Sequence, residues 1–375
     1  MIPRADALVS LERDSFDLVV VGGGITGAGV ALDAASRGYS VALLERSDFA
    51  AGTSSRSSKL IHGGLRYLQN FDLGLVREAL LERSLLVKLA PHLVHPLPLL
   101  VPSFEGKRPD RLVGVGLNMY DVMAWRRGRE DGEEWSPARH RIVEGAEAVQ
   151  LAPALEGRDP TSAYLFYDCQ TDDVRMVLSV LGEAERFGTV IANRCEAAGL
   201  VERDGRAVGV LARDTETGAE FEVSGTNVIN ATGVWADQLR PDELYTHEEM
   251  PRIRPSRGTH VIMARDSLAV EVGVIVPAGS GRTIFVLPWL GRTLVGTTDN
   301  DYEGPLDHVP ASADDIGYLL DAVNSYFGTD IQADDLTGAY AGVRPSQGST
   351  KMKRPSGVGT VAPATTGRSS RERVR

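Results

Sequence analysis

The chain has 375 residues, enough for two domains around a shared cleft, because single cores stop growing at roughly 250–300 residues. Its composition, 42% hydrophobic and 24% charged, matches soluble globular proteins and excludes wholesale disorder. A formal net charge of −11 argues against a nucleic-acid partner, and two cysteines outside any metal-ligand spacing argue against a disulfide framework or a metal site.

A strand, a glycine-rich turn, a helix and a second strand are predicted near the N-terminus. Residues 16–21 form a continuous apolar run, typical of a buried parallel strand. The turn after it carries Gly22, Gly24 and Gly27 in GxGxxG spacing, an Ala-rich helix follows, and residues 40–44 form the next apolar run. This order predicts a Rossmann-like βαβ unit.

The glycine-rich turn predicts a dinucleotide site. The first glycine allows the tight turn, the second lets the backbone approach a pyrophosphate, and the third lets helix and strand pack closely. At Ile25 and Thr26 the helix begins, and its unpaired N–H groups can meet phosphate charge. Glu45, after the second strand, can accept hydrogen bonds from a ribose 2′-OH and disfavours a 2′-phosphate. FAD or NAD therefore fits better than NADP, and the motif alone does not decide between these two.

Periodicity predicts the remaining elements. Helices are expected at residues 75–90, 111–125, 172–187 and 314–327. Strands are expected at residues 163–167, 197–201, 207–212, 220–223, 226–233 and 336–343, with several more between 258 and 298. The three short runs from 197 to 223 suit an antiparallel meander, and those between 258 and 298 suit an antiparallel sheet that could cover a substrate.

A long loop connects the chain to a known family. Residues 52–68 read Gly-Thr-Ser-Ser-Arg-Ser-Ser-Lys-Leu-Ile-His-Gly-Gly-Leu-Arg-Tyr-Leu, which resembles the signature of FAD-dependent glycerol-3-phosphate dehydrogenases, within the D-amino-acid-oxidase-like FAD oxidoreductase superfamily. Further stretches resemble the family in the same order: residues 71–98, 167–175, 230–233, 258–260, 288–289, 296–299 and 342–345. The resemblance implies an α/β fold, with a Rossmann-like FAD-binding domain and a second, antiparallel-sheet substrate domain.

The expected domains alternate along the chain. The FAD-binding domain is expected at residues 1–104 and 155–245, with a return strand at 335–350. The substrate domain is expected at residues 105–154 and 246–334. Residues 351–375 are basic, lack periodicity and are expected to form a disordered tail.

Resemblance also assigns the site residues. The hydroxyl-rich loop would lie along FAD, together with the Thr-Gly turn after a later strand. The cofactor residues implied there are Thr53, Ser54, Ser58, Lys59, His62, Thr232 and Gly233. Arg66 and Arg344 match phosphate-clamping arginines, and Tyr67 could orient a substrate oxygen. His260 matches the active-site histidine, whose near-neutral pKa suits proton transfer; a structural role is the alternative for His62 and His260.

The family oxidises sn-glycerol 3-phosphate at C2 to dihydroxyacetone phosphate and passes a hydride to the flavin. Electrons would then go to a quinone-type acceptor in a dehydrogenase, or to oxygen in an oxidase, and no short motif separates the two. We expect a cytoplasmic protein, at most peripheral at the inner face of the cell membrane. Family members usually continue well beyond Arg344 with a second flavin-contacting segment and a helical domain. The third alternative is therefore an inactive, truncated fragment that holds FAD weakly.

Overall fold

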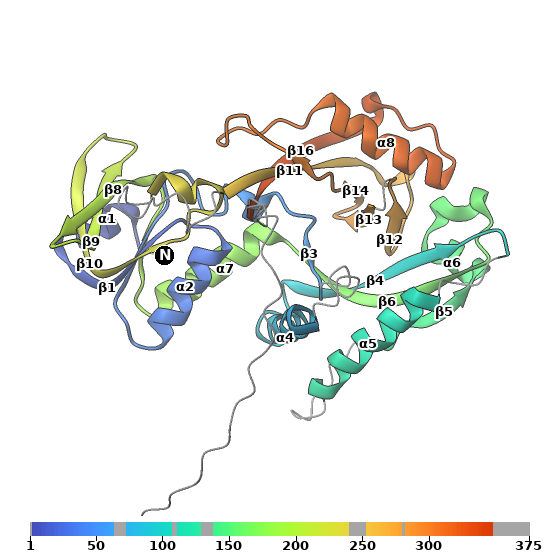
Figure 1. Ribbon diagram of the computed structural model, residues 1–375, viewed down its shortest axis with the longest axis horizontal. Coiled ribbons are helices and arrows are strands. Elements are labelled where there is room, and N and C mark those ends of the chain that lie inside the picture. The colour runs from blue at the N-terminus through green and yellow to red at the C-terminus, as the bar shows by residue number, and fades with distance from the viewer. Residues whose placement is uncertain are drawn as a thin grey trace, which may run out of the picture.

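A computed structural model describes residues 2–63, 73–106, 111–128, 138–239, 253–279 and 282–347. Two of the expected site residues, Arg66 and Tyr67, lie outside these ranges, as does the expected tail at 351–375. The described chain forms two lobes, each built around one sheet, and the strands β11 (Ile253–Ala264) and β16 (Leu336–Gln347) run from one lobe into the other (Figure 1). The expected α/β fold class is confirmed.

Sheet A, the smaller of the two sheets, has the strand order β7-β2-β1-β10-β9-β8. Its first four strands are mutually parallel, and β9 and β8 continue β10 as an antiparallel meander, as expected. The strands are β1 (Ser15–Val21), β2 (Val41–Leu44), β7 (Val190–Ala192), β8 (Cys195–Arg203), β9 (Arg206–Asp214) and β10 (Glu220–Asn230). This is the Rossmann-like domain that the glycine motif predicts.

Helices cover both faces of sheet A because side chains alternate along its strands. Val20 packs with α2 (Ile25–Ser36) and α7 (Asp173–Arg186) on one face. Its neighbours Val19 and Val21 join Leu11 of α1 (Arg4–Arg13) on the other. The sequence did not lead us to expect α1, because its ten residues mix both charges and contain no apolar run longer than three residues.

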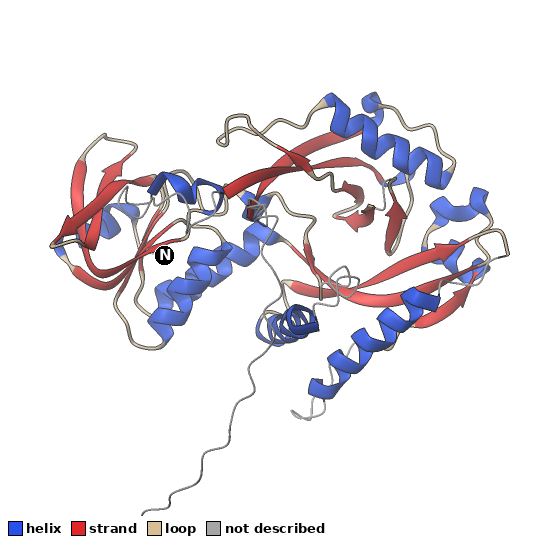
Figure 2. Cartoon of the chain, in the orientation of Figure 1, coloured by secondary structure: helices blue, strands red, loops and turns tan. Residues whose placement is uncertain are grey.

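Sheet B forms the second lobe, in the order β15-β11-β14-β13-β12-β4-β6-β3, with β16 paired to β11 and β5 to β6. It curls so that the arm of β11 and β16 faces the arm of β4 and β6 (Figure 2). Its strands are β3 (Leu60–Ile61), β4 (Val94–Ser103), β5 (Arg141–Glu144), β6 (Ser162–Thr171), β11 (Ile253–Ala264), β12 (Gly273–Pro277), β13 (Thr283–Trp289), β14 (Arg292–Gly296), β15 (Asn300–Asp301) and β16 (Leu336–Gln347).

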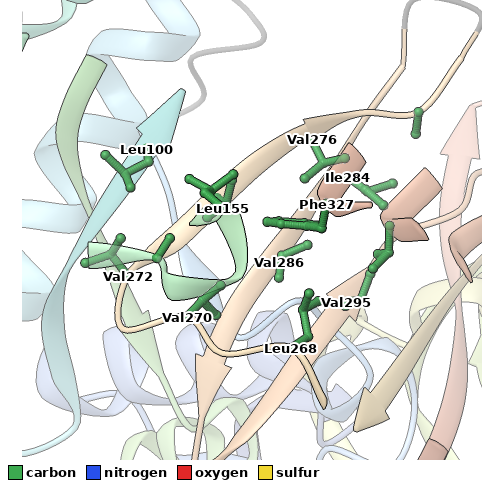
Figure 3. Close-up of a cluster of buried hydrophobic side chains, with 14 of the residues drawn as sticks. Leu100, Leu155, Leu268, Val270, Val272, Val276, Ile284, Val286, Val295 and Phe327 are labelled. Atoms are coloured by element: carbon green, nitrogen blue, oxygen red, sulfur yellow. The ribbon is translucent and has the colours of Figure 1, made fainter. Parts of the chain in front are cut away.

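A large apolar core lies against one face of sheet B. Val276, Ile284 and Val286 from neighbouring strands meet Phe327 of α8 (Ala313–Phe327) and Leu155 of the short 3-10 helix Pro153–Arg158 (Figure 3). The other helices of this lobe are α4 (Leu73–Leu89), α5 (Arg111–Gly128) and α6 (Gly145–Leu151). Within the described ranges, no helix combines the length and apolar character needed to cross a bilayer.

The structure differs from the expected division into domains. β4 and β6 belong to sheet B, although residues 1–104 and 155–245 were assigned to the FAD-binding domain. The expected return strand at 335–350 does not join sheet A, because β16 forms a long antiparallel pairing with β11, from Ile253↔Gln347 to Met263↔Leu336. Hydrogen-bonding partners far apart in sequence leave no local pattern, so apolar alternation predicted the strand and not its sheet.

Candidate functional site

A cleft of about 840 Å³ lies where β1 and β2 end. Val21 and Leu44, the last residues of those strands, line it with Met176 of α7 and with Trp235 of the short helix Gly233–Leu239. Ligands of open α/β sheets bind at the carboxyl ends of parallel strands. The cleft therefore has the position of a dinucleotide site.

The three motif glycines have different roles. Gly22 has φ +113°, and a Cβ there would lie 2.5 Å from the Ala231 carbonyl oxygen. A Cβ on Gly27 would lie 1.9 Å from the Gly22 carbonyl oxygen, so this glycine is needed for packing and does not line the cleft. At Gly24 a Cβ would meet only Ser54 Oγ, at 3.2 Å. Gly24 thus leaves the backbone open toward the cleft.

Ser54 and Glu45 hold the start of α2. The Ile25 backbone N–H donates to Ser54 Oγ at 3.0 Å, and the Gly23 N–H donates to Glu45 Oε2 at 2.8 Å. The other carboxylate oxygen of Glu45 accepts from the Ser47 N–H at 2.8 Å. The Ser47 hydroxyl also donates to that oxygen, at 3.4 Å. Glu45 therefore shapes the turn itself, and its Oε2 keeps a further lone pair for a ligand hydroxyl.

Several expected cofactor residues come together around this cleft. Gly22, Gly24, Ile25, Thr26, Glu45, Thr53, Ser54, Thr232 and Gly233 all line it. The Thr232 hydroxyl donates to Asn230 Oδ1 at 2.6 Å, and Gly233 has φ +61°. Sequence reasoning missed Arg46 and Trp235, whose guanidinium carbon and ring centroid are 4.7 Å apart at the cleft wall.

FAD fits this donor set. The first turn of α2 offers backbone N–H groups beside an open glycine, which suits a pyrophosphate. Glu45 supplies an acceptor at the end of β2, where a ribose hydroxyl is expected. The cleft volume is within the range of about 300–1,000 Å³ typical of ligand sites.

Ser58, Lys59 and His62 do not line the cleft. Lys59 is nearly buried, and its Nζ donates to Asp173 Oδ1 at 2.6 Å and to the Ser55 carbonyl at 2.7 Å. Its charge is thus paired inside the protein. Asp173, the first residue of α7, also accepts from the Ser57 hydroxyl at 2.7 Å. Sequence reasoning gave Asp173 no role, because nothing local signals a partner more than a hundred residues away.

His260 of β11 is buried and closely packed. Its Nε2 lies 2.8 Å from Ser58 Oγ, and its ring stacks on Tyr340 of β16 with centroids 4.8 Å apart. Burial, followed by the charges of Arg344 and Lys59, lowers the pKa of His260 to about 3. The expected near-neutral pKa is therefore corrected, and the imidazole is uncharged at neutral pH.

Arg344 lies on β16, which pairs with the strand that carries His260. Its Nη1 donates to Asp299 Oδ1 at 3.1 Å and to the Thr298 carbonyl at 3.3 Å, and its side chain is 39% exposed. A Cβ on Gly258 would lie 2.7 Å from Arg344 Nη2, so this glycine leaves room for the guanidinium. The structure brings a partly open cation close to a neutral imidazole.

Comparison with known proteins gives a consistent result. The family model described as FAD dependent oxidoreductase matches residues 17–363. Glycerol-3-phosphate dehydrogenase 2 of Mycobacterium tuberculosis is 40% identical over 96% of this chain and 60% of its own length. Alpha-glycerophosphate oxidase of Streptococcus pyogenes serotype M1 is 37% identical over 91% of this chain and 56% of its own. The chain thus spans about 60% of the length of the curated dehydrogenase it matches.

Solved structures agree with this. The glycerol-3-phosphate dehydrogenase from Bacillus halodurans complexed with FAD superposes with a TM-score of 0.73 at 29% identity, covering 92% of this chain and 59% of that one. The L-alpha-glycerophosphate oxidase from Mycoplasma pneumoniae with FAD bound gives 0.63 at 18% identity, covering 90% and 85%, and supports the fold alone. The family match spans most of the sequence and includes the glycine-rich cleft, so this chain belongs to the FAD dependent oxidoreductase family.

Proposed function

We propose that the chain holds FAD in the cleft between β1, β2 and α7 and oxidises sn-glycerol 3-phosphate at C2 to dihydroxyacetone phosphate. The placement of neutral, buried His260 close to the partly exposed cation Arg344 carries the proposal, because a phosphorylated alcohol needs both a proton acceptor and an anion site. The similarity to the glycerol-3-phosphate dehydrogenases of Mycobacterium tuberculosis and Bacillus halodurans supports the choice of substrate. When bound, FAD supplies the acceptor for the hydride that leaves C2.

Arg344 would bind the substrate phosphate. The Asp299 carboxylate and the Thr298 carbonyl accept from its Nη1, and its Nη2 makes two bonds of 3.3 Å, to Thr297 Oγ1 and to the same Thr298 carbonyl. A phosphate would replace the long bonds of Nη2, so that Nε and Nη2 could form two parallel bonds with its oxygens. Arg66 and Tyr67, outside the described residues, are proposed to complete this anion site. Because Arg344 lowers the pKa of His260, a phosphate dianion on Arg344 would raise that pKa and make the imidazole a stronger base.

His260 would accept the proton of the C2 hydroxyl, with Ser58 fixing the ring orientation through its contact with Nε2. Stacking on Tyr340 restricts the ring further. Ser58, Lys59 and His62 are proposed to belong to the floor beneath the substrate. Lys59 would act through its charge and its bond to Asp173.

A quinone-type electron acceptor and a peripheral membrane location at the inner face of the cell membrane remain part of this proposal. The second candidate is an oxidase that passes electrons to oxygen, which the match to alpha-glycerophosphate oxidase favours. Both candidates share the same substrate half-reaction. They differ in what reoxidises the flavin.

Turnover of the FAD-reconstituted chain with an artificial dye, without oxygen, tests the proposal. Glycerol 3-phosphate should be preferred over glycerol by at least about 100-fold in kcat/KM, because a charged site is left unpaired by glycerol. Arg344→Gln should remove most of that preference, whereas Arg141→Gln, in an exposed ion pair with Glu147, should preserve it. Equal turnover of the two alcohols would reject the phosphate site. Repeating the assay with oxygen and no dye separates oxidase from dehydrogenase.

A further inference from the structure

A buried charged cluster lies beside the proposed site and outside the cleft. Arg83 of α4 and Asp168 of β6 form an ion pair in which the side chains are 2% and 4% exposed. Arg83 Nη1 also donates to Tyr120 Oη of α5 at 2.9 Å and to the Tyr167 carbonyl at 3.0 Å. The Tyr120 hydroxyl donates to Asp168 Oδ1. Two helices and a strand thus converge on one carboxylate oxygen.

This cluster holds one backbone amide. The Gly63 N–H lies 2.9 Å from Tyr120 Oη and 3.1 Å from Asp168 Oδ1. A Cβ on Gly63 would lie 2.3 Å from Tyr120 Oη and 2.4 Å from Leu80 Cδ2, so only glycine lets the backbone come this close. Buried ion pairs seldom stabilise a fold better than apolar side chains would. The role of this cluster is therefore better sought in the Gly63 amide, which it holds in place, than in the stability of the fold.

Gly63 ends a segment, residues 57–63, whose other end is held in a similar way. Asp173 binds the Ser57 hydroxyl and the Lys59 ammonium. Between the two ends, β3 pairs with β6 through Leu60↔Gln170 and Ile61↔Cys169. The anchoring carboxylates, Asp168 and Asp173, are five residues apart on the chain, at β6 and at the start of α7.

The functional contact of this segment lies between its anchors. Ser58 carries the hydroxyl that meets His260 Nε2. Its position therefore depends on how firmly residues 57–63 are held at both ends. Desolvation, and after it the nearby negative charge of Asp168, raises the pKa of Tyr120 well above its usual range. The Tyr120 hydroxyl therefore stays protonated and donates its hydrogen bond to Asp168.

We propose that Arg83, Tyr120 and Asp168 are positioning residues that fix the Gly63 amide and thereby hold Ser58 in register with His260. The kinetic consequence rests on the proposed function, whereas the anchoring of Gly63 does not. The three residues would act through the 57–63 segment, without contacting substrate or cofactor. They would affect the rate of the proton-transfer step more than the affinity for the phosphate.

Tyr120→Phe tests this with a small change, since Asp168 can still accept from the Gly63 N–H. Tyr326→Phe is the control, because Tyr326 is a partly buried tyrosine whose ring packs on Phe104 and Phe327 in the distant core. Amide hydrogen exchange resolved at Gly63 should quicken roughly tenfold in Tyr120→Phe and stay unchanged in the control. The dissociation constant of FAD should change less than about twofold in both, because Tyr120 does not line the cleft.

With glycerol 3-phosphate and the dye, Tyr120→Phe should lower kcat roughly tenfold and change KM less than about threefold, as expected when orientation is lost and phosphate binding is kept. Unchanged exchange at Gly63 would overturn the anchoring, and equal effects of the two variants on kcat would overturn the positioning role. Asp168→Asn provides a second, stronger perturbation of the same amide. If the unsubstituted chain oxidises no glycerol 3-phosphate, the proposed function fails, and the exchange measurement still decides whether the cluster anchors Gly63.

Discussion

Adding one methyl group at Gly24 or at Gly27 should separate cofactor binding from folding. At Gly27, inside α2, helix propensity favours alanine by about 1 kcal/mol. The added Cβ would however lie 1.9 Å from the Gly22 carbonyl oxygen, and overpacking of that kind costs about 3 kcal/mol or more. Gly27→Ala should therefore destabilise the protein without FAD by a net ~2 kcal/mol.

Gly24→Ala should have the opposite profile. The backbone there is extended, with φ −81° and ψ −177°, and the new Cβ would meet only Ser54 Oγ at 3.2 Å. Stability without FAD should change by less than about 1 kcal/mol. The methyl would project where the backbone is open to the cleft, so charge-assisted bonds to a pyrophosphate should weaken by ~1.5–3 kcal/mol, about 10- to 150-fold in affinity.

Urea unfolding followed by circular dichroism measures the first quantity, and an FAD titration followed by flavin fluorescence measures the second. Gly27→Ala should lose stability without FAD, whereas Gly24→Ala should keep that stability and lose FAD affinity. If Gly24→Ala binds FAD as tightly as the unsubstituted chain, the cleft is not the cofactor site. If Gly27→Ala is as stable as the unsubstituted chain, the close contact between α2 and the glycine turn is misjudged.

Three further predictions concern single side chains. Asp173→Asn should lower the free energy of unfolding by about 3 kcal/mol, since it leaves the nearly buried Lys59 without its anion. Asp33→Asn, in an exposed pair, should leave the urea midpoint unchanged, and urea unfolding of both variants makes the comparison. His260 has a folded pKa of about 3 against 6.5 unfolded, so the unfolded state binds the extra proton and stability falls as pH drops below about 6.5. Between pH 7.5 and 5 this loss should be ~2 kcal/mol, and His260→Gln should remove that part of the pH dependence in unfolding curves. Glu45→Gln should weaken FAD binding roughly tenfold in the same fluorescence titration, because the amide offers one acceptor where the carboxylate offers two; an unchanged dissociation constant would contradict the ribose assignment.

Local signals allowed most elements to be predicted. The helix expected at 172–187 is α7, which Asp172 caps by accepting from the Arg175 N–H at 3.1 Å. The helix expected at 314–327 is α8, which begins after Ser312 and ends at Gly328 with φ +73°. Such caps leave clear marks in a sequence. The glycine turn was recognisable for the same reason, since its backbone demands are met within six residues.

Contacts between distant residues could not be predicted. Nothing near Lys59 indicates that Asp173 takes its charge, and nothing near His260 indicates that Tyr340 covers its ring. Burial and the charges of Arg344 and Lys59 lower the pKa of His260, and the sequence around His260 signals none of them, which is why the residue was anticipated and its pKa was not. The sheet to which β16 belongs depends in the same way on a partner about eighty residues earlier.

The pairing of β16 with β11 has a consequence for synthesis on the ribosome. Every described strand of sheet A lies before residue 231, so that sheet can assemble while the rest of the chain is still being made. Sheet B cannot be completed, nor Arg344 delivered beside His260, until β16 has emerged. Because the Thr53 hydroxyl donates to the Val343 carbonyl at 2.5 Å, the last described strand also closes over the loop that borders the cleft. A nascent chain would thus fold sheet A, which carries the glycine-rich turn, first, and would bring His260 and Arg344 together last.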